Sequence, residues 1–129
     1  MDNFKVMVVD DELDFLETII KRLKARKIEV TGAESGQKAL ELLAGQDFDV
    51  IVLDVKMPGM DGIETLREIK KRKPLTEVIM LTGHASVESG IQGMQLGAFD
   101  YVMKPVALDE LLEKMRQAYE RKLIQEGKA

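Results

Sequence analysis

The segment Val50–Asp54, which reads VIVLD, decides the fold class of this chain. Its four apolar residues follow one another without polar alternation, and three of them are β-branched, which is typical of a strand buried on both faces of a parallel sheet. Similar apolar runs occupy residues 6–9, 78–81 and 101–103. A weaker run at residues 28–30 carries Glu29 at its centre, so we predict an edge strand there.

The segments between these runs carry apolar residues at helical spacing. The helical stripes are Leu13, Leu16, Ile20 and Leu23; Ala39, Leu40 and Leu43; Ile63, Leu66 and Ile69; and Leu108, Leu111, Leu112, Met115, Ala118 and Tyr119. Asp61 followed by Glu64 resembles a capping box and predicts the start of the third helix. The helix expected over residues 86–97 is the weakest, since Gly90 and Gly93 each cost about 1 kcal/mol relative to alanine. Strand and helix alternate five times, which predicts a doubly wound α/β domain with helices on both faces of one parallel sheet.

The composition excludes several classes of protein. The chain has 129 residues, a length typical of one domain, with a formal net charge of −4 and no cysteine. Disulfides and thiolate zinc sites are therefore excluded, and the acidic balance argues against a surface that coats nucleic acid. No secretory signal is evident and no apolar run exceeds four residues, so we expect a soluble cytoplasmic protein without a membrane span. We place the domain at residues 1–120 and expect the polar residues 121–129 to form a frayed tail or a linker stub.

Polar side chains follow the predicted strands at the point where each strand ends. Asp10 and Asp11 follow the first run, Asp54 ends the central one, Thr82 follows the next and Lys104 the last. Each residue alone has an ordinary structural explanation, as a helix cap, a strand threonine or a solvated lysine. Because the carboxyl ends of parallel strands meet at one edge of the sheet, where ligands bind, we expect all five side chains to share a site.

The chemistry of this residue set favours a hard metal ion and a phosphoryl group. Three neighbouring carboxylates repel one another unless a proton or a cation intervenes, and ligands that are all oxygen favour Mg²⁺ or Mn²⁺. Lys104 and Thr82 are suited to hold phosphate oxygens. No glycine-rich nucleotide-binding motif occurs, so the phosphate is not expected to belong to a bound nucleotide. A carboxylate can itself be the nucleophile, and the residues therefore predict Mg²⁺-dependent phosphoryl transfer to Asp54 on the central strand.

These residues resemble the receiver domain of two-component response regulators, including the receivers of chemotaxis regulators. The resemblance rests on Asp10-Asp11, Asp54 within LDVKMPGMDG, Thr82-Gly83 and Lys104-Pro105, in the family's order and spacing over about residues 4–120. It implies a flavodoxin-like fold with five helices and a five-stranded sheet in the order 2-1-3-4-5. It also implies a cis peptide bond between Lys104 and Pro105.

The resemblance assigns Asp54 as the acceptor of a phosphoryl group from a phosphohistidine on a sensor kinase or a phosphotransfer protein. Asp11, Asp54 and the backbone carbonyl of Lys56 are expected to bind Mg²⁺, and Asp10 is expected to assist through water. Lys104 is expected to pair with the phosphoryl oxygens. The domain would then be a signalling module, not an enzyme with its own substrate, because it catalyses only its own phosphorylation and dephosphorylation.

The resemblance also implies a switch. Thr82 is expected to hydrogen-bond a phosphoryl oxygen, and Tyr101 is expected to turn inward as Thr82 moves. We hypothesise that the helix over residues 86–97 repacks, and that the face made by the fourth helix, fifth strand and fifth helix controls an output partner or domain. A homodimer formed on phosphorylation is also compatible with the resemblance. No direct binding to nucleic acid or membrane is expected of this domain.

Two other classes share part of the pattern. A hydrolase of the haloacid dehalogenase type also uses an aspartyl nucleophile and Mg²⁺, but it needs a second Asp two residues after the nucleophile, where this chain has Lys56. A pseudo-receiver, which binds partners without being phosphorylated, usually lacks one of Asp11, Asp54 or Lys104, and all three are present here.

Overall fold

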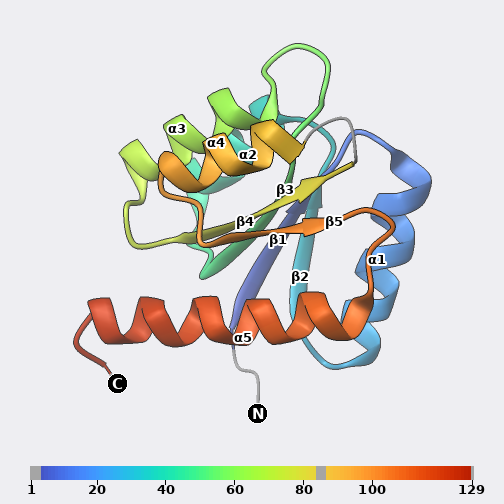
Figure 1. Cartoon of the computed structure of the whole chain (residues 1–129). Helices are drawn as coiled ribbons and strands as arrows, with labels where there is room; N and C mark the ends of the chain where they lie inside the picture. Colours follow the sequence, from blue (N-terminus) through green and yellow to red (C-terminus); the bar gives the residue numbers. More distant parts are fainter. Residues whose placement is uncertain (1–3, 84–86, 129) are drawn as a thin grey trace.

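A five-stranded parallel sheet forms the centre of the computed structural model, which describes residues 4–83 and 87–128 (Figure 1). The strands are β1 (Lys5–Val9), β2 (Glu29–Ala33), β3 (Val50–Asp54), β4 (Glu77–Thr82) and β5 (Asp100–Met103). Their order is β2-β1-β3-β4-β5, and every neighbouring pair is parallel. The predicted fold class and strand order are confirmed. Glu29 is exposed on the edge strand β2, also as predicted.

Helices cover both faces of the sheet. They are α1 (Leu13–Ala25), α2 (Gly36–Gly45), α3 (Gly62–Arg72), α4 (Val87–Gln95) and α5 (Leu108–Gln125). Helices α1 and α5 lie on one face, and α2, α3 and α4 lie on the other (Figure 1). All five residues of β3 are buried, because strands flank it on both sides and helices cover both faces. Within residues 4–83 and 87–128, we find no helix with the length and apolar character needed to cross a membrane.

Local signals in the sequence place several helix ends. The Asp61 side chain accepts a hydrogen bond from the backbone N–H of Glu64 at 2.9 Å, so the predicted N-cap of α3 is confirmed. Helix α4 ends at Gln95, and the chain turns at Gly97, whose φ of 106° lies in the left-handed region that favours glycine. The expected start of this helix at Ser86 lies outside the described residues.

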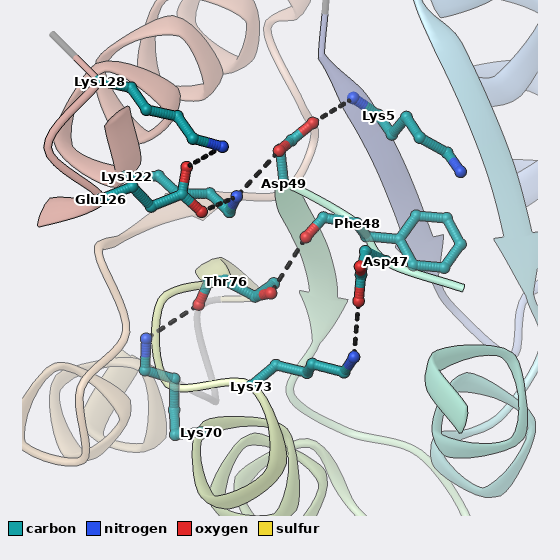
Figure 2. Close-up of polar contacts among 10 residues, drawn as sticks. All are labelled: Lys5, Asp47, Phe48, Asp49, Lys70, Lys73, Thr76, Lys122, Glu126 and Lys128. Carbon is teal, nitrogen blue, oxygen red and sulfur yellow. Dashed lines mark hydrogen bonds and ion pairs between the residues drawn. The ribbon is translucent and has the colours of Figure 1, made fainter. Parts of the chain in front are cut away.

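The last helix differs from the frayed tail that the polar composition predicted. Helix α5 continues past residue 120 to Gln125, because its charged residues have partners at the amino-terminal edge of the sheet. Arg121 makes two hydrogen bonds to the buried carboxylate of Glu77, the first residue of β4. Lys122 lies 3.0 Å from Asp49 and 2.6 Å from Glu126 (Figure 2). Polar residues on this part of α5 therefore fasten the helix to the sheet.

Loops at the same edge of the sheet are closed by further hydrogen bonds (Figure 2). Asp49 accepts from the backbone N–H of Lys5 at 2.8 Å, and the Thr76 hydroxyl donates to the carbonyl of Phe48 at 3.0 Å. Lys70 at the end of α3 donates to the carbonyl of Thr76 at 2.9 Å. The starts of β1, β3 and β4 are thus linked to one another and to two helices.

Candidate functional site

The polar residues that follow the strands converge at the carboxyl edge of the sheet, as the sequence predicted. Asp10, Asp11 and Asp54 each place a carboxylate oxygen within 4.8 Å of those of the other two. Asp10 and Asp54 are buried and Asp11 is partly exposed. Lys104 comes from the loop after β5 and lies 3.6 Å from an oxygen of Asp54. Two loops and one strand end therefore bring three carboxylates and one ammonium group together.

Lys104 is shared by several acidic groups. Its Nζ lies 2.9 Å from Asp10 and 3.1 Å from Glu12, and it also lies 4.8 Å from the centre of the Phe15 ring. Burial alone would lower the pKa of Lys104, but hydrogen bonds to Asp10 and Glu12 outweigh burial and raise it to about 12. The peptide bond between Lys104 and Pro105 is cis, as the resemblance implied. The sequence analysis missed Glu12 and Phe15, although each stands one helical turn or less after the Asp pair.

Asp54 is a buried carboxylate with a raised pKa. Its side chain is only 9% exposed, and burial together with the nearby Asp10 raises its pKa from 3.8 to about 6, against the opposing effect of Lys104. The single positive charge of Lys104 therefore does not compensate the negative charge of the three carboxylates. The arrangement favours an added cation, and the oxygen donors match the ligands that Mg²⁺ prefers.

The loop after β3 is held close to Asp54 by Gly62. A Cβ on Gly62 would lie 2.3 Å from the carbonyl oxygen of Asp54 and 2.6 Å from the Cα of Val55, so only glycine fits there without a backbone shift. The backbone N–H of Gly62 donates to the carbonyl of Val55 at 2.9 Å. Lys56 lies in this loop, two residues after Asp54, with its side chain exposed.

Thr82 lies at the end of β4, where its backbone carbonyl accepts a hydrogen bond from the backbone N–H of Lys104 at 2.7 Å, while its side chain is directed to a residue outside the cluster. The residue is fully buried, and its hydroxyl donates to the sulfur of Met103 at 3.3 Å. Tyr101 is partly buried and packs with the apolar residues beneath α3 and α4. The sequence analysis named Thr82 and Tyr101 but missed Met103.

Comparison with known proteins gives a consistent result. The family model of the response regulator receiver domain matches residues 6–116. The chain is 38% identical over 117 residues to the transcriptional regulatory protein ZraR of Escherichia coli K12, covering 91% of this chain and 26% of that protein. It is 37% identical over 113 residues to the DNA-binding transcriptional regulator NtrC of the same strain, covering 88% of this chain and 24% of NtrC. The chain thus spans about a quarter of the length of these two relatives.

Solved structures are similar over nearly the whole chain. A response regulator receiver domain protein from Clostridium thermocellum superposes with a TM-score of 0.90 at 37% identity. The match covers 95% of this chain and 98% of that one.

Proposed function

This chain belongs to the response regulator receiver family, and we propose that it accepts a phosphoryl group on Asp54 in a Mg²⁺-dependent reaction and transmits the resulting change to an output partner or domain. The family membership makes it a phosphoacceptor signalling domain of two-component systems. The observation that carries the assignment to Asp54 is its position: a buried carboxylate at the end of the central strand, 3.6 Å from Lys104 and beside two further carboxylates.

Asp54 acts as the nucleophile in this proposal. A carboxylate oxygen forms a bond to phosphorus, the phosphorus–nitrogen bond of the donor phosphohistidine breaks, and its electron pair remains on the imidazole. With a pKa of about 6, Asp54 is mostly ionised at neutral pH and is available to attack. Lys104 supplies a positive charge for the phosphoryl oxygens, and its raised pKa keeps it protonated.

The acidic cluster fits a divalent cation. Both oxygens of Asp10 already accept hydrogen bonds, one from the backbone N–H of Glu12 at 2.9 Å and one from Lys104 at 2.9 Å. This favours direct ligation by Asp11 and Asp54, with the backbone carbonyl of Lys56 as a third ligand and Asp10 acting through water. Mg²⁺, or Mn²⁺ in its place, would neutralise charge on the cluster and on the phosphoryl oxygens.

The proposed output lies on the face made by α4, β5 and α5. On α4, Ile91 is 47% exposed and Met94 is 39% exposed, so this face presents apolar side chains to a partner. We propose that Thr82 and Tyr101 change position when Asp54 is phosphorylated and that α4 repacks. The receiver expected at residues 1–120 would extend to the end of α5 at Gln125, and the chain beyond α5 would lead toward an output domain like those of the longer relatives, or a homodimer would form through this face.

Mass spectrometry after incubation with acetyl phosphate and Mg²⁺ tests the proposal. A receiver gains one phosphoryl group per chain, and the gain is absent in Asp54→Asn and after addition of EDTA. A hydrolase would instead release phosphate over many turnovers, and a pseudo-receiver would not react. Multiple turnover without a stable adduct, or an unchanged adduct in Asp54→Asn, would refute the assignment.

Hydrogen exchange with and without beryllofluoride tests the switch. Protection of amides is expected to change across residues 82–105 and to stay constant in α2, which packs on β1 and β2, at the opposite end of the strand order from β5. A purified sensor kinase labelled on its histidine is the expected donor in a transfer assay. Unchanged protection across residues 82–105 would refute the proposed output face.

A further inference from the structure

The hydroxyl of Thr82 is directed away from the phosphorylation site. It donates to Met103 Sδ at 3.3 Å, and Met103 stands opposite Thr82 in the register of β4 and β5. Strand β4 lies between β3, which carries Asp54, and β5, which carries Met103. A hydroxyl that reaches Met103 therefore lies on the side of β4 that faces away from Asp54.

The methyl group of Thr82 is confined as well. A Cβ on Gly90 of α4 would lie 2.7 Å from the Thr82 methyl carbon, so only a glycine lets α4 pack this closely on Thr82. The same Cβ would lie 3.5 Å from the Tyr101 ring. Rotation of Thr82 about its Cα–Cβ bond therefore breaks the contact with Met103 and moves the methyl group from its present place beside Gly90.

We propose that Met103 is a positioning residue that holds Thr82 in its unphosphorylated orientation, an inference that rests on the proposed function. A thioether sulfur is a weak hydrogen-bond acceptor, whereas a phosphoryl oxygen is a charged and much stronger one. Met103 thus satisfies the buried hydroxyl in the unphosphorylated protein and releases it when a phosphoryl group appears on Asp54. An unpaired buried hydroxyl is energetically costly, and in the described part of the chain every buried side-chain nitrogen or oxygen has a partner.

Two substitutions of Met103 are expected to act in opposite directions. Met103→Leu keeps the volume but removes the acceptor, which leaves the Thr82 hydroxyl unpaired before phosphorylation. Met103→Gln supplies an amide oxygen, a stronger acceptor, at a similar reach. Beryllofluoride affinity in the presence of Mg²⁺ should rise by about threefold to tenfold in Met103→Leu and fall by about the same factor in Met103→Gln. Met7→Leu, at a buried methionine of β1 that packs in the core beneath α2 and α3, is the matched control and should leave the affinity unchanged.

A double-mutant cycle separates this role from a general effect on packing. In a Thr82→Ala background, Met103→Leu and Met103→Gln should have no further effect on beryllofluoride affinity, because the hydroxyl that they act on is gone. A second readout needs neither metal nor analogue. With the methionine methyl groups labelled with carbon-13 and EDTA present, Thr82→Ala should shift the Met103 methyl signal. The signal of Met7 on β1, which β3 separates from β4, should stay in place.

The outcomes distinguish a failure of the proposed function from a failure of the role of Met103. If the wild-type protein does not bind beryllofluoride with Mg²⁺, the proposed function fails. If it binds, the role of Met103 alone is refuted by any of three results: unchanged affinity in both Met103 variants, the same direction of change in both, or persistence of the changes in the Thr82→Ala background. A Met103 methyl signal that does not respond to Thr82→Ala would refute it independently.

Discussion

The substitution Asp54→Asn tests how much the buried charge of Asp54 lowers the free energy of unfolding of the metal-free protein. Burial and the nearby Asp10 raise the pKa of Asp54 from 3.8 to about 6. The native state therefore binds this proton more tightly than the unfolded chain does. The stabilisation that protonation provides is complete below pH 3.8 and is lost as the pH rises through about 6. At about 1.36 kcal/mol per pKa unit, the full effect is about 3 kcal/mol, and about 1.4 kcal/mol of it is lost between pH 5 and pH 8.

Asparagine cannot ionise, so the variant avoids this loss. At pH 8 we expect Asp54→Asn to exceed the wild type in free energy of unfolding by up to about 3 kcal/mol, with the difference shrinking as the pH falls. Urea denaturation followed by circular dichroism, in EDTA at pH 5, 6, 7 and 8, measures the difference. Saturating Mg²⁺ should remove the advantage of the variant, because the cation compensates the charge that asparagine lacks.

Asp47→Asn is the matched control. Asp47 is exposed, and a hydrogen bond from Lys73 lowers its pKa, so its contribution to stability is present at neutral pH and lost on acidification. Its substitution should therefore give no gain in stability as the pH rises. The reasoning about Asp54 is refuted if Asp54→Asn shows no growing advantage between pH 5 and pH 8, or if both variants follow the same pH profile.

Three further predictions concern the packing and the metal site. Arg121→Met removes the main partner of the buried Glu77 and should lower the free energy of unfolding by about 2 kcal/mol in urea denaturation. The loss is smaller than for a fully buried pair because Arg121 is 41% exposed. An unchanged denaturation midpoint would contradict this. Gly62→Ala places a Cβ against backbone and should cost about 1–3 kcal/mol by the same assay, whereas Gly45→Ala, which meets open space in α2, should be neutral or stabilising. Mg²⁺ at about one hundred times its Kd should stabilise the wild type by about 2.7 kcal/mol in a thermal melt, and Asp11→Asn should lose most of this gain.

The fold could be predicted from the sequence because its signals are local. Continuous apolar runs such as Val50–Asp54 specify strands buried on both faces, and parallel strands bring their carboxyl ends to one edge regardless of how the loops are built. The meeting of Asp10, Asp54 and Lys104 follows from that topology alone. What the resemblance added was the strand order, the cis peptide bond before Pro105 and the roles of the individual residues.

The contacts that the sequence analysis missed depend on tertiary geometry. Glu12 reaches Lys104 only because the loops after β1 and β5 end side by side, and Met103 reaches Thr82 only through the register of β4 and β5. The sequence also contains a pattern that predicts the full length of α5, although the polar composition of residues 121–129 obscures this pattern. The buried positions Met115 and Ala118 continue at helical spacing to Lys122, whose partners Asp49 and Glu126 compensate its charge. A charged residue in register with an apolar stripe therefore indicates a partner on the sheet and not the end of the helix.

The two edges of the sheet are held by contacts of different strength, and this difference suits a switch. At the amino-terminal edge, charged hydrogen bonds fix α5 and the loops, with Arg121 on Glu77 and Lys122 on Asp49 (Figure 2). At the carboxyl edge, one thioether holds the hydroxyl of Thr82, and the ammonium group of Lys104 is shared among acidic groups that a phosphoryl group can displace. A new charge on Asp54 therefore competes only with weak or shared contacts. The resulting movement is expected in β5 and α4, while the anchored half of α5 stays in place as the support against which they move.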